Sequence, residues 1–550
     1  MMRAGLLAAG IALSALGGFA QNAPAAGSYI VSGVVLSATT GAPLDRAEVT
    51  LSTAGEEETQ VAETVTGEGG AFRFEHLDAG KYALGASRRG YVTSRYQEHA
   101  GGYSTAIVTG PDLVSENLRF TLYPTAAIGG SITDDNGDPV GNARVTLYRQ
   151  QQEAGKAKVV EANADVTDDD GTYEFDRLHA GTYYVGVSAT PWYAFHSPQR
   201  TAPDGTALPD QARSPLDVAY PMTFYANATD SGSATPIQIN AGDHPEVDVS
   251  LHAVAAVHVL IRAAKPDPHR GFSMPQLELP VFGGQESFGS EQFQAPGQVF
   301  IHSSGDAMIV DIGGIAPGRY TLRDFAENGT SRPVPVDLTS DQSVDLTTPG
   351  SSADVSGKLE MASGTPLPHV TMLQLRPAGG GGTTSVAASA DGSFDVRAVA
   401  PGEYTVQVMT SGGPLDIVQM AASGAAVHGQ RIVVGSDPVL LAAEVSRGSA
   451  SVSGFARRDG KGLGGALVLL VPEQPRDHDD LFRLDQSDSD GSFTLSRVVP
   501  GNYTLVAIEN GWSLEWSRPE AIVRYLPRGV KLHITGEPAN LDLSSPVNVQ

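Results

Sequence analysis

The chain has 550 residues, a formal net charge of −26 and no cysteine. The length is enough for several domains, and the acidic charge disfavours binding to nucleic acid or anionic membranes, while cationic partners and divalent ions stay compatible with it. Without cysteine there is no disulfide, no thiolate metal site, no cysteine nucleophile and no lipid anchor on an N-terminal cysteine.

Residues 1–20 have the pattern of a secretory signal peptide. Arg3 supplies the positive charge, residues 4–19 are apolar and mostly small, and residues 18–20 fit the small-x-small cleavage rule, so that Gln21 is the expected new N-terminus. We therefore expect an exported protein that is periplasmic, on the outer surface or secreted, with an uncleaved membrane anchor as the alternative. No later stretch approaches ~20 apolar residues, so we expect no transmembrane span after cleavage.

A sequence motif that predicts a turn, a strand, a second turn and a second strand recurs along the chain. Its first copy is Gly69-Gly70-Ala71-Phe72 with Ala79-Gly80-Lys81-Tyr82, and its last is Asp490-Gly491-Ser492-Phe493 with Pro500-Gly501-Asn502-Tyr503. In four copies the two glycines are 10 positions apart; they are Gly70 and Gly80, Gly171 and Gly181, Gly392 and Gly402, and Gly491 and Gly501. A degraded copy has Met308 in place of the first glycine. Such self-similarity predicts a repeat architecture.

The residue types of this motif predict β-structure. Asp-Gly before an alternating run is a hairpin signal, because glycine tolerates the positive φ of a tight turn. Phe493 and Leu495 alternate with Thr494, so one face of the strand is apolar. The tyrosine two positions after the second glycine predicts a tyrosine corner with a buried ring, while ligand binding is the alternative and needs an exposed ring. These tyrosines are Tyr82, Tyr183, Tyr320, Tyr404 and Tyr503.

A second recurring sequence motif precedes each copy of the first. Val31-Ser32-Gly33-Val34 and Val452-Ser453-Gly454-Phe455 are two examples, and each is followed by a polar turn and another apolar strand. The whole unit resembles the carboxypeptidase regulatory-like domain, a prealbumin-like β-sandwich related to Cna-B-type and carbohydrate-binding-like folds. The resemblance implies an all-β repeat protein of the bacterial envelope, built as a tandem array of about five prealbumin-like or Ig-like sandwich modules. In that family the domain is an accessory module without catalytic residues.

Five modules follow the signal peptide in this interpretation. Their expected bounds are 28–123, 124–252, 253–348, 349–445 and 446–550. The second carries a long insertion, roughly 192–233. The third is divergent and is either the same sandwich with altered turns or a different small β domain. Helical periodicity is almost absent, and its best candidate is 517–525, where Pro519 can begin a short helix or a single helical turn in a loop.

The sequence lacks the common catalytic spacings, and we expect neither an enzyme nor a cofactor. There is no His-Glu-x-x-His, no Gly-x-Ser-x-Gly and no P-loop. The acidic stretch 477–480 around His478 is expected to be a solvated loop, with a metal site as the alternative. Two aspartate-rich turns share half of a calcium-loop pattern, without its distal glutamate, so turn chemistry is favoured over a weak calcium site. Their candidate ligands are Asp168, Asp170, Asp488 and Asp490.

Four aromatic residues are candidate ligand-binding residues. Tyr91, Trp192 and Trp512 each lie 11 positions after the second turn glycine of their module, and Trp516 is close to the last of them. Exposed rings serve as stacking platforms in sugar-binding sandwiches, which suggests a carbohydrate ligand. Capping of the sandwich core by the ring is the alternative, and the equivalent positions favour it.

These observations lead to an exported, non-enzymatic multi-module protein for binding or scaffolding at the cell envelope, with carbohydrate binding as one form of it. Its expected partner is a protein or glycan ligand at the cell surface. An accessory to a secreted peptidase or carbohydrate-processing enzyme is the alternative. A hydrolase hidden in the insertion 192–233 or in the third module is a further, less favoured one.

Overall fold

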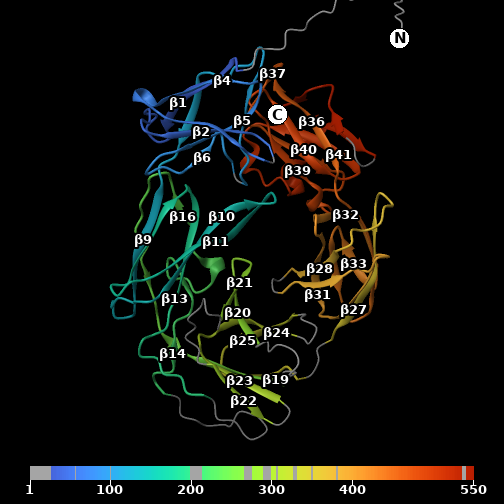
Figure 1. The fold of residues 1–550 in the computed structure, drawn as a ribbon. Coiled ribbons are helices and arrows are strands. Elements are labelled where there is room, and N and C mark those ends of the chain that lie inside the picture. The colour runs from blue at the N-terminus through green and yellow to red at the C-terminus, as the bar shows by residue number, and fades with distance from the viewer. Residues whose placement is uncertain are drawn as a thin grey trace, which may run out of the picture.

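The computed structural model describes residues 27–55, 57–99, 101–198, 214–265, 275–288, 299–304, 307–325, 331–347, 351–378, 382–535 and 540–550. The predicted signal peptide, 1–20, lies outside them. The described residues form five β-sandwich modules, each with its own apolar core, which confirms the predicted all-β tandem array (Figure 1).

In the first module, β1 pairs antiparallel with β4 and parallel with β8, and this trio recurs in the other modules. One sheet consists of β4 (Ala71–Leu77), β1 (Tyr29–Ser37) and β8 (Leu118–Leu122). The other consists of β3 (Gln60–Val65), β2 (Glu48–Thr53), β5 (Gly80–Ser87), β6 (Ser94–Arg95) and β7 (Ile107–Thr109). The 3-10 turn η1 (Glu68–Gly70) precedes β4.

The second module has the same two sheets, and part of its insertion pairs with the next module. One sheet consists of β12 (Thr172–Leu178), β9 (Ala126–Thr133) and β17 (Val249–Ser250). The other consists of β11 (Lys156–Val166), β10 (Arg144–Glu153), β13 (Gly181–Ser188), β15 (Thr223–Phe224) and β16 (Ile237–Ile239), with η2 (Ser231–Ser233) in the insertion. From the insertion, β14 (Val218–Ala219) pairs with β18 (Val254–Ala255).

The third module keeps the trio of pairings, because β19 pairs antiparallel with β23 and parallel with β26. One sheet consists of β22 (Val299–Ser304), β23 (Ala307–Ile315), β19 (Val257–Ala264) and β26 (Gln342–Asp345). The other consists of β21 (Gly284–Phe288), β20 (Gln276–Val281), β24 (Gly318–Phe325) and β25 (Ser331–Leu338). This divergent part of the sequence therefore has the sandwich topology of the other modules.

The fourth module joins its two sheets into one, because the long strand β32 pairs with both β31 and β35. The order is β29 (Thr384–Ala387), β28 (Thr371–Pro377), β31 (Gly402–Thr410), β32 (Gly413–Ser423), β35 (Val439–Ser446), β27 (Ala353–Met361) and β30 (Ser393–Val399). Two further strands extend this sheet: β34 (Arg431–Val434) pairs with β31, and β33 (Ala425–His428) pairs with β34.

The fifth module carries the short helical segments. One sheet consists of β37 (Lys461–Gly462), β36 (Ala450–Arg458), β40 (Ser492–Val498), β43 (Asn540–Asp542) and β44 (Val547–Asn548). The other consists of β39 (Arg483–Gln486), β38 (Leu467–Pro472), β41 (Gly501–Ile508) and β42 (Val530–Ile534). Outside the sheets lie η3 (Asp479–Leu481), η4 (Gly511–Ser513), α1 (Pro519–Ile522) and η5 (Leu526–Arg528). As predicted, α1 is a single turn that begins at Pro519, and no helix of the described residues could cross a membrane.

The Asp-Gly turn does not form the predicted hairpin. It joins β39 and β40, which belong to different sheets, so the chain crosses the sandwich there. Gly491 has a φ of +86°, and a Cβ on it would stand 2.4 Å from the carbonyl oxygen of Ala456. Equivalent close approaches, to Val35, Ile132 and Leu359, occur at Gly70, Gly171 and Gly392. In the third module, where Met308 replaces this glycine, β22 and β23 pair directly as a hairpin.

All five repeated tyrosines lie in the same environment. Each ring is buried, and each hydroxyl donates to the backbone carbonyl four residues earlier. The pairs are Tyr82 with Asp78 (3.1 Å), Tyr183 with His179 (2.9 Å), Tyr320 with Ala316 (2.7 Å), Tyr404 with Ala400 (2.8 Å) and Tyr503 with Val499 (3.0 Å). The hydroxyl thus closes the Pro-Gly or Ala-Gly turn that links the two sheets.

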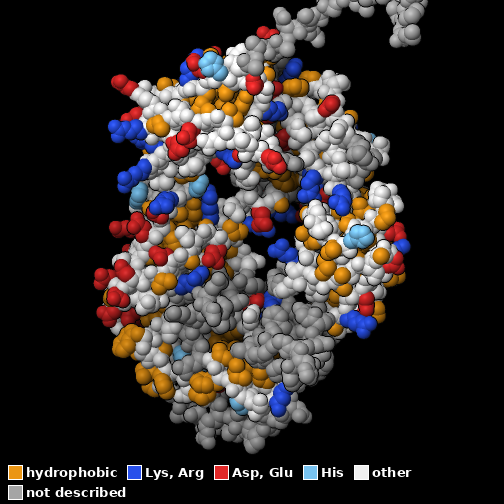
Figure 2. Space-filling view, in the orientation of Figure 1, with side chains coloured by type: hydrophobic (Ala, Val, Ile, Leu, Met, Phe, Trp, Pro, Cys, Tyr) orange, Lys and Arg blue, Asp and Glu red, His pale blue; other side chains and the backbone are white. Residues whose placement is uncertain are grey.

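The modules follow one another around a ring, and the fifth lies beside the first (Figure 1). In the space-filling view the ring has gaps at its centre (Figure 2). The arrangement differs from a rod, in which the first and last modules would lie far apart.

Candidate functional site

The four predicted aromatic residues lie in different surroundings. Trp192 is 90% exposed, and its ring meets Tyr193 edge-on, with centroids 5.7 Å apart. Tyr91 packs on the core of the first module, next to the bridge that it forms with Pro124 at the start of the second. Trp512 and Trp516 belong to a separate apolar cluster of the fifth module, which faces other modules. Equal spacing in sequence therefore does not give these rings equal roles.

Trp512 contacts the first module. Its ring stacks on His99, with centroids 4.9 Å apart and an interplanar angle of 11°, and lies 5.2 Å from the ring of Tyr103. Its indole N–H donates to the carbonyl of Gly465 at 3.1 Å, which fixes the ring within its own module. The polar and apolar parts of this indole are both engaged, as is usual for tryptophan at an interface.

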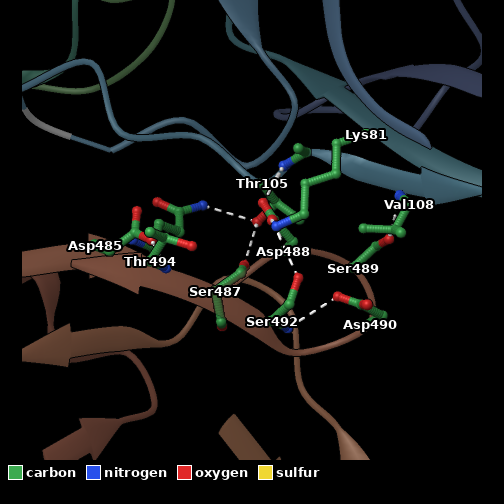
Figure 3. A network of polar contacts seen from close by, with 12 residues as sticks. Lys81, Thr105, Val108, Asp485, Ser487, Asp488, Ser489, Asp490, Ser492 and Thr494 are labelled. Carbon is green, nitrogen blue, oxygen red and sulfur yellow. Dashed lines mark hydrogen bonds and ion pairs between the residues drawn. The ribbon is translucent and has the colours of Figure 1, made fainter. Parts of the chain in front are cut away.

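The turn at Asp488 and Ser489 forms the polar part of the same interface (Figure 3). The carboxylate of Asp488 pairs with Lys81 at 2.5 Å and accepts the backbone N–H of Ala106 at 3.2 Å. Ser489 donates its N–H to Ala106 and accepts the N–H of Val108. This turn, which includes two of the predicted calcium candidates, thus binds protein donors of the first module. Within the described residues, no group of acidic or histidine side chains has the geometry of a metal site.

A buried side-chain network lies beside this turn. The amide of Gln486 donates to the hydroxyl of Thr105 and to the carbonyl of Gln97, both at 2.8 Å, and Gln486 and Thr105 are each 2% exposed. The amide oxygen of Gln486 lies 2.9 Å from Nδ1 of His99. Separating the two modules would leave these polar groups without partners until water reaches them, so the network favours this one relative position.

Asp485 supports the network from within the fifth module. Its carboxylate accepts the backbone N–H of Thr494 at 2.7 Å and that of Gln486 at 2.8 Å. Burial raises the pKa of Asp485 to about 6, the nearby Asp488 adds to the rise, and the two backbone donors and Lys81 oppose it. The protonation of this carboxyl is therefore coupled to the contact between the first and fifth modules.

Trp516 contacts the second module at the tip of the β10–β11 hairpin. A Cβ on Gly155 would stand 2.4 Å from the indole ring, so only glycine fits there. The hydroxyl of Ser517 donates to the carbonyl of Gly155 at 2.9 Å. Glu515 accepts the backbone N–H of Ala157 at 3.1 Å, and Lys156 pairs with Asp479 at 2.8 Å. The hairpin tip is therefore held from both sides.

The predicted solvated loop 477–480 lies instead where three modules meet. Asp479 pairs with Lys156 of the second module, and a Cβ on Gly429 of the fourth module would stand 1.4 Å from the carbonyl oxygen of Asp477. The expected solvated loop is only partly found: Asp477 is exposed, whereas His478, Asp479 and Asp480 are half-buried beside neighbouring modules. Burial raises the pKa of Asp480 to about 7, with Asp479 and Asp416 adding to the rise.

The fourth and fifth modules also share an ion pair. Asp416 on β32 lies 2.7 Å from Arg483 and 3.8 Å from Arg497, and the side chains of Asp416 and Arg483 are mostly buried. The guanidinium of Arg483 also donates to three backbone carbonyls, those of Asp480, Phe482 and Arg497. This set of hydrogen bonds fixes β32 against the fifth module.

An acidic hollow lies on the outer face of the second module. The hollow has a volume of about 710 Å³. Five carboxylates line it, and no lysine or arginine does; they are Asp165, Asp168, Glu174, Glu246 and Asp248. Asp168 accepts N–H groups from Asp170 and Thr172 and the Thr172 hydroxyl, which lowers the pKa of Asp168. Figure 2 shows acidic side chains gathered along this module.

Two segments of the chain match a known family. Residues 30–111 and 127–252 match the model of the carboxypeptidase regulatory-like domain. The chain contains carboxypeptidase regulatory-like domains. They correspond to the first two modules and agree with the resemblance seen in the repeated sequence motif. No curated protein sequence matches the chain.

Three solved structures illustrate what the chain is similar to. The minor pilin GBS52 of Streptococcus agalactiae is 16% identical, over 44% of this chain and 100% of that one, with a TM-score of 0.21. The TIE protein of Bacillus anthracis is 9% identical, over 94% and 74%, with a TM-score of 0.17. The shaft pilin SpaA of Lactobacillus rhamnosus GG is 10% identical, over 40% and 97%, with a TM-score of 0.18. These values are too low to support an inference about function.

Sequence reasoning missed the residues that close the ring. Lys81, Thr105 and Gly155 have no unusual sequence context, and their partners lie more than 300 positions away. A signal existed only for Trp512 and Trp516, whose residue type is typical of interfaces. Their partners could not be read from the sequence.

Proposed function

We propose that this chain is an exported, non-enzymatic scaffold whose modules are locked in a ring and present a binding surface at the cell envelope. The observation that carries the proposal is the double contact of the fifth module, through Trp512 with the first module and through Trp516 with the second. The matched family supports the non-enzymatic part, since its domain is a non-catalytic type of module.

A ring suits a scaffold because it fixes distances between modules that short linkers alone would leave variable. The closing contacts combine a stacked tryptophan, a buried amide network and an ion pair, and each depends on a defined relative position. Binding surfaces on different modules then keep a fixed spacing. A partner that touches two modules binds more tightly to such a platform, because less freedom is lost on binding.

Small-angle X-ray scattering of the full chain tests the ring. We expect a compact particle for the wild type, and a larger maximum dimension for the double variant Trp512→Ala, Trp516→Ala, in which the fifth module is released. Trp192→Ala is the matched control, since its ring is exposed and contributes to neither contact. An extended wild-type particle with the same dimension as the double variant would contradict the proposal.

Trp192 favours carbohydrate as the ligand class. Its ring is 90% exposed, whereas Trp512 and Trp516 are engaged between modules. Exposed indole faces stack on sugar rings, and the adjacent Tyr193 adds a second aromatic surface at 88° to the first. Glycan-array binding that is lost in Trp192→Ala and kept in Tyr123→Ala, another exposed aromatic residue, would support this ligand class. Equal binding by both variants would rule out Trp192 as the platform.

A further inference from the structure

The second and third modules meet around a buried chain of histidine and aspartate side chains. Two backbone contacts bring the modules together there, the pairing of β14 with β18 and the bond from Ala256 N–H to the carbonyl of Asp217. Phe282 of the third module also packs among aromatic rings of the second, including Tyr148 and Phe224. The two histidines of the joint, His196 and His258, are 4% and 3% exposed.

His258 lies at the centre of this joint. Its Nε2 is 3.3 Å from a carboxylate oxygen of Asp217 in the second module, and its Nδ1 is 3.4 Å from one of Asp311 in the third. His258, Asp217 and Asp311 are 3%, 8% and 1% exposed. A neutral imidazole has only one N–H group, so only the protonated ring can donate to both carboxylates.

Two further titratable groups of the described residues stand near His258, namely Asp341 and His196. Asp341 accepts the backbone N–H of His258 at 2.8 Å. His196 lies 2.7 Å from the second oxygen of Asp217 through its Nδ1, while its buried Nε2 has no hydrogen-bond partner among the residues that the structure describes. An Nδ1–H group of His196 can donate to this oxygen, so Asp217 accepts from a histidine of each module. One positive charge on His258 therefore stands among three carboxylates.

We propose that protonated His258 is a charged link between the second and third modules, and that the link is lost when the ring gives up its proton. The neutral ring can donate to only one of the two carboxylates, so one of its two hydrogen bonds and the attraction of its positive charge for both carboxylates are lost, which favours separation of the modules. Burial opposes the charge on His258, but the hydrogen bond to Asp311 and the charges of Asp311, Asp217 and Asp341 outweigh it and raise its pKa.

The raised pKa of His258 determines how the stability of the joint depends on pH. A group whose pKa is higher in the closed joint than in the open one stabilises the joint fully below the ordinary value of 6.5, and the stabilisation is lost as the pH rises through the raised pKa. The joint is therefore closed in mild acid and loosens in alkali. Asp217 also holds His196, four residues after Trp192, so the joint adjoins the segment that carries the exposed tryptophan.

Fluorescence energy transfer across the joint tests the link. The chain has no cysteine, so Asn136→Cys in the second module and Ser340→Cys in the third, both exposed, can be labelled selectively. We expect the transfer efficiency of the full chain to fall between pH 5 and pH 9 with a midpoint above 6.5. In His258→Gln the low efficiency should persist at every pH, and His244→Gln, at an exposed histidine of the second module, should titrate like the wild type.

A constant efficiency in the wild type, or the same titration in His258→Gln, would overturn the proposal. If His258→Gln does not fold, histidine NMR signals of the labelled wild type and of Asp217→Asn decide instead. A His258 midpoint above 6.5 that moves down in Asp217→Asn supports the link, and an unchanged midpoint refutes it. Gly313→Ala adds a steric test, because its Cβ would stand 2.4 Å from the His258 ring and displace it.

Discussion

The indole ring of Trp516 occupies the space in which a Cβ on Gly155 would stand, 2.4 Å from the nearest ring atom. These residues are separated by more than 300 positions in sequence, yet each is fixed by its own module, Gly155 by the β10–β11 turn and Trp516 by the apolar cluster of the fifth module. The fit of one glycine to one ring thus decides where the fifth module lies relative to the second.

Gly155→Ala should displace Trp516 and loosen the ring. Gly137→Ala is its matched control, since Gly137 also has a positive φ (+82° against +71°) in a turn of the second module but has nothing within 4 Å of the added Cβ. Overpacking typically costs about 1–3 kcal/mol beyond the backbone strain that both variants share. Scattering should show a larger particle for Gly155→Ala alone, and equal dimensions for the two variants would contradict the contact.

Gln486→Ala should weaken the contact between the first and fifth modules more than Lys81→Ala does. The first change leaves the buried hydroxyl of Thr105 and the carbonyl of Gln97 without a donor, at about 1–3 kcal/mol. Lys81 is 41% exposed in its pair with Asp488, so its loss should cost about 0–1 kcal/mol. Denaturant unfolding of both variants measures the difference, and the reverse order would show that charge dominates the contact.

Tyr503→Phe should destabilise the fifth module by about 0.5–1.5 kcal/mol, because the buried carbonyl of Val499 loses its hydrogen-bond donor while the packing of the ring is kept. Tyr404→Phe should have a similar effect on the fourth module, since the geometry is the same. Tyr123→Phe, at an exposed tyrosine, is the control. Thermal unfolding followed by calorimetry gives the comparison, and no loss in either corner variant would mean that the hydroxyl contributes nothing.

Stability should fall as the pH rises through about 6 to 7, because the pKa values of Asp485 and Asp480 are raised to about 6 and about 7 in the folded protein. Groups with a raised pKa contribute stability that is complete below the ordinary value of 3.8 and is lost above the raised one. Asp480→Asn should flatten the upper part of this dependence. Asp459→Asn, in an exposed turn, should not. Unfolding free energies between pH 5 and pH 8 check both variants.

The sequence alone determined the internal plan of each module. Alternation of apolar residues defined the strands, the turn glycines marked close backbone approaches such as that of Gly491 to Ala456, and the repeated tyrosine marked the corner. These features are local or recur at fixed spacing, so one chain contains several copies of the same signal. The predicted hairpin at Asp490-Gly491 was wrong because the two strands beside a tight turn can enter different sheets, which depends on where their apolar faces are buried.

Only the tertiary structure decided how the modules are arranged and what the aromatic residues do. Trp192 and Trp512 hold equivalent positions in their modules, yet one is exposed and the other stacks on His99. His258 gains its partner Asp217 only when two modules meet. The physical reason is that a repeat fixes the surroundings of a residue within its own sandwich, whereas the surface presented by another module depends on side chains that are distant in sequence and have no periodic pattern.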